Sequence, residues 1–290
     1  MTSTLSSVRI GHWTNTNSTS GCTVLLFGTL TPAAVDVRGG APGTRETDLL
    51  ASGKTVRSVD AIVLTGGSAF GLASADGVMR YLHERGRGYP TSAGPVPIVT
   101  AAVIFDLRQE TVDLPNAESG YLACQNSGLL PLEFAGLTGG GAGATIRKLW
   151  GSEHILPGGL GISTVQTAFG RVTAVVLLNA AGAPIHQPDA GRVSREMLYA
   201  GGLQLGVREA TTIGAIIVEG FSDFALLKRC TISAHDGLTR SILPAHTVFD
   251  GDLFFAAGLN PGAPADGAYL AVPTAAEAAV EKAIESILAL

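Results

Sequence analysis

The stretch VDAIVLTGGSAFGLASADGVMRYL, residues 59–82, indicates the class of the fold. Residues 59–64 are a short, mainly apolar run of the kind that forms a buried strand. The glycine pair at 66–67 predicts a tight turn. The apolar spacing beyond it predicts a helix that begins at Ser68, a good N-cap residue, and ends near Arg85. A buried strand joined through a tight turn to such a helix is typical of an α/β protein.

The alternation of strand and helix continues along the rest of the chain. A helix is predicted at 226–243 from its four-residue apolar spacing, and the last helix is predicted to begin at a capping box formed by Thr274 and Glu277. No internal repeat and no linker rich in proline, serine or charge separates these elements. We therefore expect residues 1–290 to form one domain, a layered α/β sandwich. Further buried strands are predicted at 96–105, 172–178 and 212–218.

Two apolar runs near the start of the chain predict a strand pair. Residues 23–27 and 33–37 flank the sequence GTLTP at 28–32, which contains glycine and proline. Because glycine and proline are common in turns, we expect the two runs to pair with each other as neighbouring strands.

The composition excludes several classes of protein. Apolar residues make up 46% of the 290 residues, charged residues make up 15%, and the mean hydropathy is +0.33. Intrinsic disorder needs the opposite balance, and the apolar runs are far shorter than the roughly 18 residues of a membrane-spanning helix. The net charge of −5, without a lysine and arginine cluster, argues against a nucleic-acid partner.

The cysteine content indicates a reducing compartment. Cys22, Cys124 and Cys230 are an odd number and contain no CxxC pair, so a disulfide framework is not expected. The first residues do not have the pattern of a signal peptide. We therefore expect a cytoplasmic protein.

A glycine run at 139–144, GGGAGA, can be aligned with the dinucleotide fingerprint G-x-G-x-x-A. That fingerprint should directly follow a strand, and residues 133–138 make a poor one. Lys148 follows the run but does not complete a phosphate-loop spacing. The run is therefore predicted to be a tight loop, and no cofactor is expected.

Two aspartates close to each other, Asp250 and Asp252, follow the sequence PAHTVF. On an extended segment, side chains two residues apart point the same way, so this pair could hold a cation, orient a nucleophile or raise the pKa of one partner. A solvated turn is the commoner explanation for an isolated DGD. The six histidines never occur as HxH or HExxH, so no metal site is predicted.

Thr211 and Thr212 begin the apolar segment TTIGAIIV. Threonine is an ordinary strand residue, but a threonine freed by self-cleavage carries its own base. Its new α-amine has a reference pKa of about 8 and can take the hydroxyl proton at neutral pH. The pattern alone leaves both interpretations open.

Several longer motifs resemble the DmpA-like peptidase family, which includes D- and β-aminopeptidases and 6-aminohexanoate-oligomer hydrolases. The resemblance extends from about Val8 to Gly258 and is closest to the nylon-oligomer-hydrolase branch. It implies an αββα sandwich of the N-terminal-nucleophile type that assembles into homo-oligomers, as tetramers or larger. The motifs are VDVRGGAPGTRETDLL (35–50), VDAIVLTGGSAFGLASADGVMRYL (59–82), PIVTAAVIFDL (97–107), TTIGAI (211–216), AHDGLTRSI (234–242) and HTVFDGD (246–252).

The resemblance also implies a set of site residues. Self-cleavage between Ala210 and Thr211 would give segments 1–210 and 211–290, with Thr211 as the nucleophile. Asn179 would donate a hydrogen bond to the oxyanion, and Lys148 would add positive charge and lower the pKa of the α-amine. Asp250 and Asp252 would hold the α-amine or the lysine in place. The implied catalytic residues are Thr211, Lys148, Asn179, Asp250 and Asp252.

Two positions depart from the family pattern. Ala210 stands where this branch commonly has asparagine, although the cleavage uses the carbonyl group and not that side chain. Phe105 stands where relatives carry a tyrosine near the active site, so a hydroxyl that could bind the oxyanion is replaced by a ring hydrogen. Tyr81 or Tyr89 could compensate.

The function implied is a self-processed threonine amide hydrolase acting through an acyl-enzyme on short peptides, oligoamides or other small molecules. Two alternatives stay open: an acyltransferase of the ornithine-acetyltransferase type, and a relative that binds a ligand without processing or turnover. No nucleic acid, membrane, metal or cofactor is expected.

Overall fold

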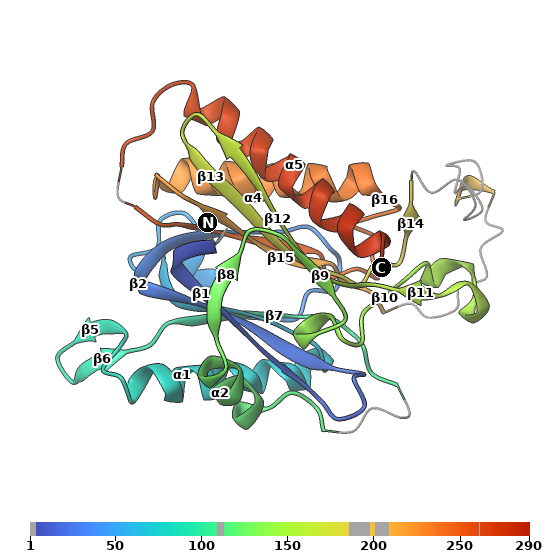
Figure 1. Cartoon of the computed structure of the whole chain (residues 1–290), viewed down its shortest axis with the longest axis horizontal. Coiled ribbons are helices and arrows are strands. Elements are labelled where there is room, and N and C mark those ends of the chain that lie inside the picture. Colours follow the sequence, from blue (N-terminus) through green and yellow to red (C-terminus); the bar gives the residue numbers. More distant parts are fainter. Residues whose placement is uncertain (1–3, 109–112, 186–197, 201–208, 261) are drawn as a thin grey trace.

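Two β-sheets lie face to face between two layers of helices (Figure 1). The structure, a computed structural model, describes residues 4–108, 113–185, 198–200, 209–260 and 262–290. Helices α1 (Ser74–His83) and α2 (Ala117–Gln125) cover the outer face of the first sheet. Helices α4 (Phe224–Ser241) and α5 (Ala268–Leu288) cover the second. This is the αββα layering that the family resemblance implied.

The first sheet contains β1 (Thr4–Thr14), the first half of β2 (Gly21–Val37), β3 (Thr44–Arg45), β4 (Ser58–Thr65), β7 (Val99–Val103) and β8 (Gly128–Pro131). The second contains the rest of β2, β9 (Phe134–Gly136), β12 (Gly159–Thr167), β13 (Gly170–Leu178), β15 (Ile213–Val218) and β17 (Leu253–Gly258). Separate short pairs are β5 (Tyr89–Thr91) with β6 (Gly94–Val96), β10 (Thr145–Ile146) with β11 (Leu156–Pro157), and β14 (Ala183–Pro184) with β16 (Ile242–Leu243). The described 3-10 turns are η1 (Asp48–Leu50), η2 (Ser68–Ala73), η3 (Gly139–Gly141), η4 (Lys148–Trp150) and η5 (Ser152–His154).

Strand β2 belongs to both sheets. Its first half pairs with β1 and β4, the register with β4 shifts between Leu26 and Thr31, and residues Ala33 to Val37 pair with β17. The prediction that the runs 23–27 and 33–37 pair with each other is therefore wrong. The first half of β2 is hydrogen-bonded to β1 and β4 and the second half to β17, so the two runs form one long strand that joins the sheets.

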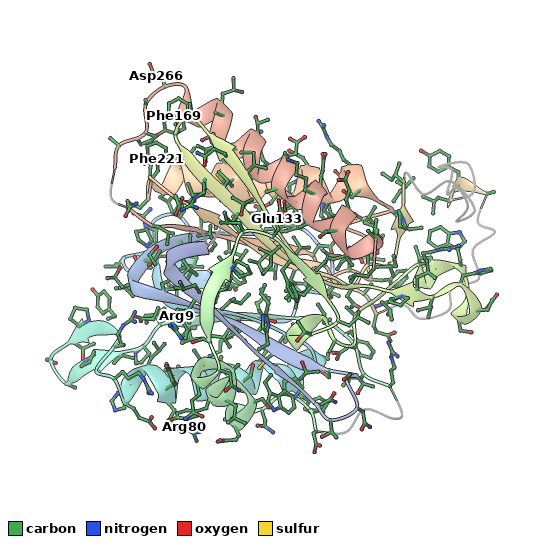
Figure 2. The ribbon with its side chains drawn as sticks, in the orientation of Figure 1. Arg9, Arg80, Glu133, Phe169, Phe221 and Asp266 are labelled. Carbon is green, nitrogen blue, oxygen red and sulfur yellow. The ribbon has the colours of Figure 1, made fainter. Side chains whose placement is uncertain are left out.

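The apolar side chains between the layers follow the period of two expected in strands. Phe255 faces the core between the two sheets, where it joins Phe27 and Ile217, whereas its neighbour Phe254 faces α4 and α5. Side chains fill the spaces between the layers, and Phe169 packs against the outer cluster beside α5 (Figure 2). The second sheet is thus buried on both faces.

Two predicted helix starts are wrong. Ser68 has a φ of 51° and lies inside η2, which precedes α1, and the N-cap of η2 is Gly67. Helix α5 begins at Ala268, and the Thr274 hydroxyl donates to the carbonyl of Leu270 within that helix. Small and apolar residues upstream of Thr274 are buried against the second sheet, so the helix extends past the apparent cap.

Helices α1 and α2 cross at glycines on each of them. A Cβ atom at Gly77 would lie 1.6 Å from the carbonyl oxygen of Ala117, and one at Gly120 would lie 1.9 Å from that of Ser74. Each glycine therefore allows the backbone of the other helix to approach. None of the described helices is long and apolar enough to cross a membrane.

Gly77→Ala should lower the free energy of unfolding by about 1–3 kcal/mol, because the added methyl group meets backbone that must move. Alanine is otherwise the better helix residue by about 1 kcal/mol, so a loss of stability identifies the helix contact as its cause. Gly128→Ala is the control, since a Cβ there meets nothing within 4 Å. Chemical denaturation measures both, and equal effects would contradict the prediction.

Candidate active site

The sheet topology brings the predicted site residues to one edge. β15 and β17 are parallel neighbours, so the residues before them come together, Thr212 with Asp252 and Thr211 with Gly251. β13 runs antiparallel to β15, so its last residues end at the same edge, where Asn179 follows. A further bridge pairs Ala210 with Asp250. Residues from distant parts of the sequence therefore meet because of strand direction alone.

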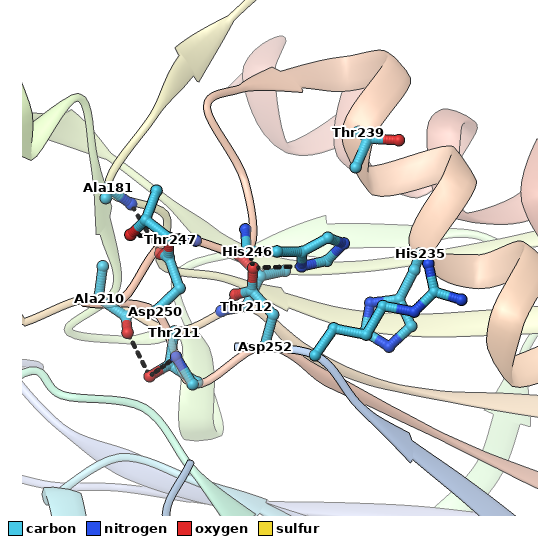
Figure 3. Close-up of polar contacts among 12 residues, drawn as sticks. Ala181, Ala210, Thr211, Thr212, His235, Thr239, His246, Thr247, Asp250 and Asp252 are labelled. Carbon is cyan, nitrogen blue, oxygen red and sulfur yellow. Dashed lines mark hydrogen bonds and ion pairs between the residues drawn. The ribbon is translucent and has the colours of Figure 1, made fainter. Parts of the chain in front are cut away.

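The Thr211 hydroxyl lies against the carbonyl group of the preceding residue. Thr211 Oγ1 donates to the carbonyl oxygen of Ala210 at 2.5 Å (Figure 3). The backbone N–H of Gly251 points to the same place, at 3.1 Å from the Ala210 oxygen and 3.2 Å from Thr211 Oγ1. The Thr211 N–H donates to the carbonyl of Asn179 at 2.9 Å. The hydroxyl and the peptide bond before it are thus held together by neighbouring backbone.

Thr212 is placed differently from Thr211. Its backbone N–H donates to Asp252 Oδ1 at 2.6 Å, and its side chain is fully buried. Thr212 Oγ1 has no hydrogen-bond partner among the residues that the structure describes. The contact with the Ala210 carbonyl distinguishes Thr211 from its neighbour, which the sequence pattern did not.

Lys148, in η4, is 2% exposed. Its Nζ donates to Asn179 Oδ1 at 2.8 Å and to the carbonyl of Glu209 at 3.0 Å. Burial lowers the pKa of Lys148 to about 7, and the charge of Asp250 opposes that shift in part. The lysine can therefore exchange its proton near neutral pH.

Asn179 orients Lys148 in this structure. Its Oδ1 accepts from Lys148 and from the Thr145 N–H, and its Nδ2 donates to the Phe105 carbonyl at 3.1 Å. The role expected from the resemblance, a donor to the oxyanion, is not the arrangement seen here. At the Ala210 carbonyl, the backbone donor is the N–H of Gly251.

Asp250 and Asp252 are both 1% exposed and are hydrogen-bonded to the surrounding chain. Asp250 accepts from the Thr247 hydroxyl at 2.6 Å, the Thr247 N–H at 2.9 Å and the Ala181 N–H at 3.4 Å. Burial and the nearby Asp252 raise the pKa of Asp250. Within the described chain, neither carboxylate accepts a hydrogen bond from Lys148, and of the two it is the charge of Asp250 that opposes the lowering of the lysine pKa.

A cavity of about 420 Å³ opens beside Thr211. Phe105 lies between this cavity and a second one of about 570 Å³, which is lined by Lys148. Tyr81 lines another cavity with residues of α1, and Tyr89 lies in β5, so neither contributes a hydroxyl to the cavity beside Thr211. The first cavity is lined by Ala41, Pro42, Gly43, Ser68, Ala69, Val103, Phe105, Glu209, Ala210, Thr211, Val248 and Phe249.

Three contributors to the site were missed by sequence reasoning. One is the backbone N–H of Gly251, where a side chain would lie 2.8 Å from Thr211 Oγ1. Another is the loop after β2, whose Gly39 and Ala41 N–H groups donate to the carbonyls of Asp252 and Asp250. The third is His246, considered only as a metal ligand, which binds Asp252. Over the described ranges, no group of three or more His, Cys, Asp or Glu side chains is placed to hold a metal ion.

The fold is that of the N-terminal-nucleophile hydrolases. The chain superposes on a Burkholderia sp. β-aminopeptidase with a TM-score of 0.68 and 20% identity, covering 98% of this chain and 84% of that one. It superposes on the Ochrobactrum anthropi L-aminopeptidase D-Ala-esterase/amidase, a variant of the Ntn-hydrolase fold, with a TM-score of 0.67 and 17% identity, covering the same shares.

Sequence comparison identifies the family. The sequence model of peptidase family S58 matches residues 4–289, and the chain belongs to this family, as the motifs predicted. An uncharacterized aminopeptidase of Mycobacterium leprae is 39% identical over 87% of this chain and 76% of its own length. The 6-aminohexanoate-oligomer endohydrolase of Paenarthrobacter ureafaciens is 31% identical over 82% and 68%. The protein is therefore a hydrolase of peptide or other amide bonds.

Lys148→Met should change how stability depends on pH. The pKa of Lys148 is about 7 in the fold and 10.5 ordinarily, so the unfolded chain binds more protons between these values. Stability of the wild type therefore gains from Lys148 as the pH rises from about 7 to about 10. We expect the stability of Lys148→Met relative to the wild type to fall over that range.

Urea unfolding at pH 6 to 10 measures the difference. Lys54→Met, which removes an exposed lysine, controls for the loss of one positive charge. A difference between Lys148→Met and the wild type that does not vary with pH would contradict the prediction.

Proposed function

We propose that the chain is the precursor of a threonine amide hydrolase that cleaves itself between Ala210 and Thr211, giving segments 1–210 and 211–290. One observation carries the proposal. The Thr211 hydroxyl lies 2.5 Å from the carbonyl oxygen of Ala210, and the Gly251 N–H donates to that same oxygen. A nucleophile and an oxyanion donor thus already converge on one peptide bond.

Maturation would proceed by an acyl shift. Thr211 Oγ1 attacks the Ala210 carbonyl carbon, and the negative charge that develops on the oxygen is stabilised by the Gly251 N–H. The hydroxyl proton passes to the Thr211 nitrogen, the C–N bond breaks, and Ala210 becomes an ester on Thr211. Water then hydrolyses the ester, which releases the Ala210 carboxylate and leaves Thr211 with a free hydroxyl and a free α-amine.

In turnover the same hydroxyl would attack the substrate carbonyl. The Thr211 α-amine accepts the hydroxyl proton and returns it to the leaving amine, which leaves an acyl-enzyme for water to hydrolyse. The positive charge of Lys148 would favour the neutral, basic form of that amine. Asp252, which holds the Thr212 N–H, would keep the amine end of the new chain in place.

The substrates we propose are short peptides or oligoamides that present a small, mainly apolar acyl group to the cavity beside Thr211. Support comes from the lining of that cavity, where Pro42, Val103, Phe105 and Phe249 are apolar. Support also comes from the relatives, which are aminopeptidases and 6-aminohexanoate-oligomer hydrolases.

Homo-oligomeric assembly belongs to the same proposal. Val248, which lines the cavity, is 75% exposed, and Phe70, next to the lining residue Ala69, is 68% exposed. Large apolar side chains gathered around a site favour coverage by another protein surface, such as a second copy of this chain.

Thr211→Ala should abolish self-cleavage, because no hydroxyl remains to attack Ala210, whereas Thr211→Ser should retain it. Thr212→Val is the matched control: it keeps the shape of the neighbouring threonine and removes a hydroxyl that has no partner within the described chain. A denaturing gel with intact-mass measurement identifies the two fragments.

An intact wild-type chain, or cleavage that persists in Thr211→Ala, would refute the proposal. Incubation of the cleaved protein with an amide substrate, with and without an added amine, then separates hydrolysis from acyl transfer. We expect the carboxylic acid as the main product in both reactions.

A further inference from the structure

A partly buried histidine binds the carboxylate that accepts from the Thr212 N–H. His246 Nδ1 lies 2.9 Å from Asp252 Oδ2, and the His246 backbone N–H donates to the same oxygen at 2.9 Å (Figure 3). The other oxygen of Asp252 accepts from the Thr212 N–H. The carboxylate therefore bridges His246 and the backbone next to Thr211.

The hydrogen-bond partners fix where the imidazole protons lie. A carboxylate is only an acceptor, so Nδ1 of His246 carries a proton in either charge state of the ring. His235, on α4, has Nε2 at 3.1 Å from the carbonyl oxygen of Asp36, which likewise makes that nitrogen the donor. Burial lowers the pKa of His235 to about 4, so this ring is neutral at physiological pH.

His235 packs against His246. The two ring centroids are 4.6 Å apart at an interplanar angle of 74°, and Phe254 borders His235 on another side at 5.0 Å. His246 Nε2 is buried and has no hydrogen-bond partner among the residues described. The His246 ring is thus held in place by packing against His235, and its polar contact is with Asp252.

The backbone of His246 lies in an uncommon region. Its φ is 57°, in the left-handed region that few residues other than glycine adopt, although asparagine, aspartate and histidine adopt it more often than the rest. In this conformation both the N–H and the ring of one residue reach the same carboxylate oxygen. Such a backbone persists where the surrounding structure holds it, and these positions concentrate at functional sites.

We propose that His246 is a positioning residue for Thr211 and acts through Asp252. By donating Nδ1–H to Asp252, it keeps that carboxylate aimed at the Thr212 N–H. The carboxylate in turn holds the Thr211 backbone with its hydroxyl at the Ala210 carbonyl. This inference rests on the proposed threonine mechanism and adds a residue to it.

The two histidines have different acidic partners: Asp36 faces His235, and Asp252 is bound by His246. Asp36, at the end of β2, pairs with Lys228 of α4 at 2.6 Å and with Arg38 at 2.8 Å. Arg38 and Asp36 act on His235 through their charges, and His235 Nε2 lies 3.6 Å from Asp36 Oδ2. Asp250, on the same segment as His246, is hydrogen-bonded to Thr247 and Ala181.

His246→Asn and His246→Asp test the inference as a matched pair. Both side chains tolerate a left-handed backbone and both remove the ring. Asparagine can place an N–H donor near the position of Nδ1, whereas aspartate places a carboxylate against Asp252. We expect self-cleavage of His246→Asn to stay within about threefold of the wild type, and that of His246→Asp to fall by about tenfold or more at pH 8.

The pH profile adds a readout that loss of ring packing would not change. Two carboxylates in contact share a proton as the pH falls, which restores a donor between them. The cleavage rate of His246→Asp should therefore recover relative to His246→Asn toward pH 5. Equal rates of the two variants at every pH would overturn the inference. Substitution of the exposed His83 by Asn and Asp controls for the change of residue type.

A second measurement does not depend on cleavage. In the uncleaved Thr211→Ala chain, hydrogen exchange of the Thr212 amide reports the bond to Asp252 directly. We expect His246→Asp to speed that exchange by about tenfold or more and His246→Asn to leave it close to the parent rate. Unchanged exchange in both would overturn the positioning role, whereas a wild-type chain that never cleaves would refute only the proposed function.

Discussion

The parallel pairing of β15 with β17 determines which of the candidate site residues meet. It sets Ile213 opposite Leu253, so the residues just before each strand lie side by side. The Gly251 N–H then reaches the Ala210 carbonyl, and Asp252 reaches the Thr212 N–H. Had the strands run antiparallel, the acidic pair would lie at the opposite edge of the sheet from the threonines.

The strands could be predicted from the sequence where a run of residues is almost entirely apolar. The runs at 59–64 and 172–178 are apolar enough to indicate buried strands without knowledge of the neighbouring strands, and both were predicted correctly. The two halves of β2 were misassigned because the polar turn residues between them resemble a hairpin, whereas their partners, β4 and β17, are distant in sequence. The cap at Thr274 failed for the same reason, since packing against the second sheet extends α5.

The site was predictable as a set of residues but not as a set of contacts. The family resemblance implied Lys148 and Asn179, and the structure places Lys148 Nζ 2.8 Å from Asn179 Oδ1. The donor at the Ala210 carbonyl is a backbone N–H, which no side-chain pattern can indicate. His246 was missed because its partner depends on a left-handed backbone turn.

The position of β15 within the second sheet has a consequence for the connectivity of the chain. β15 and β17 lie together between β13 on one side and β2 on the other. A break before Thr211 would leave these central strands bonded along both flanks to strands of the other segment. Cleavage would then turn one chain into two without opening the sheet. The segments 1–210 and 211–290 would therefore unfold together as a single cooperative unit. Once unfolded, however, they would have to find each other by diffusion, so refolding would become a concentration-dependent association.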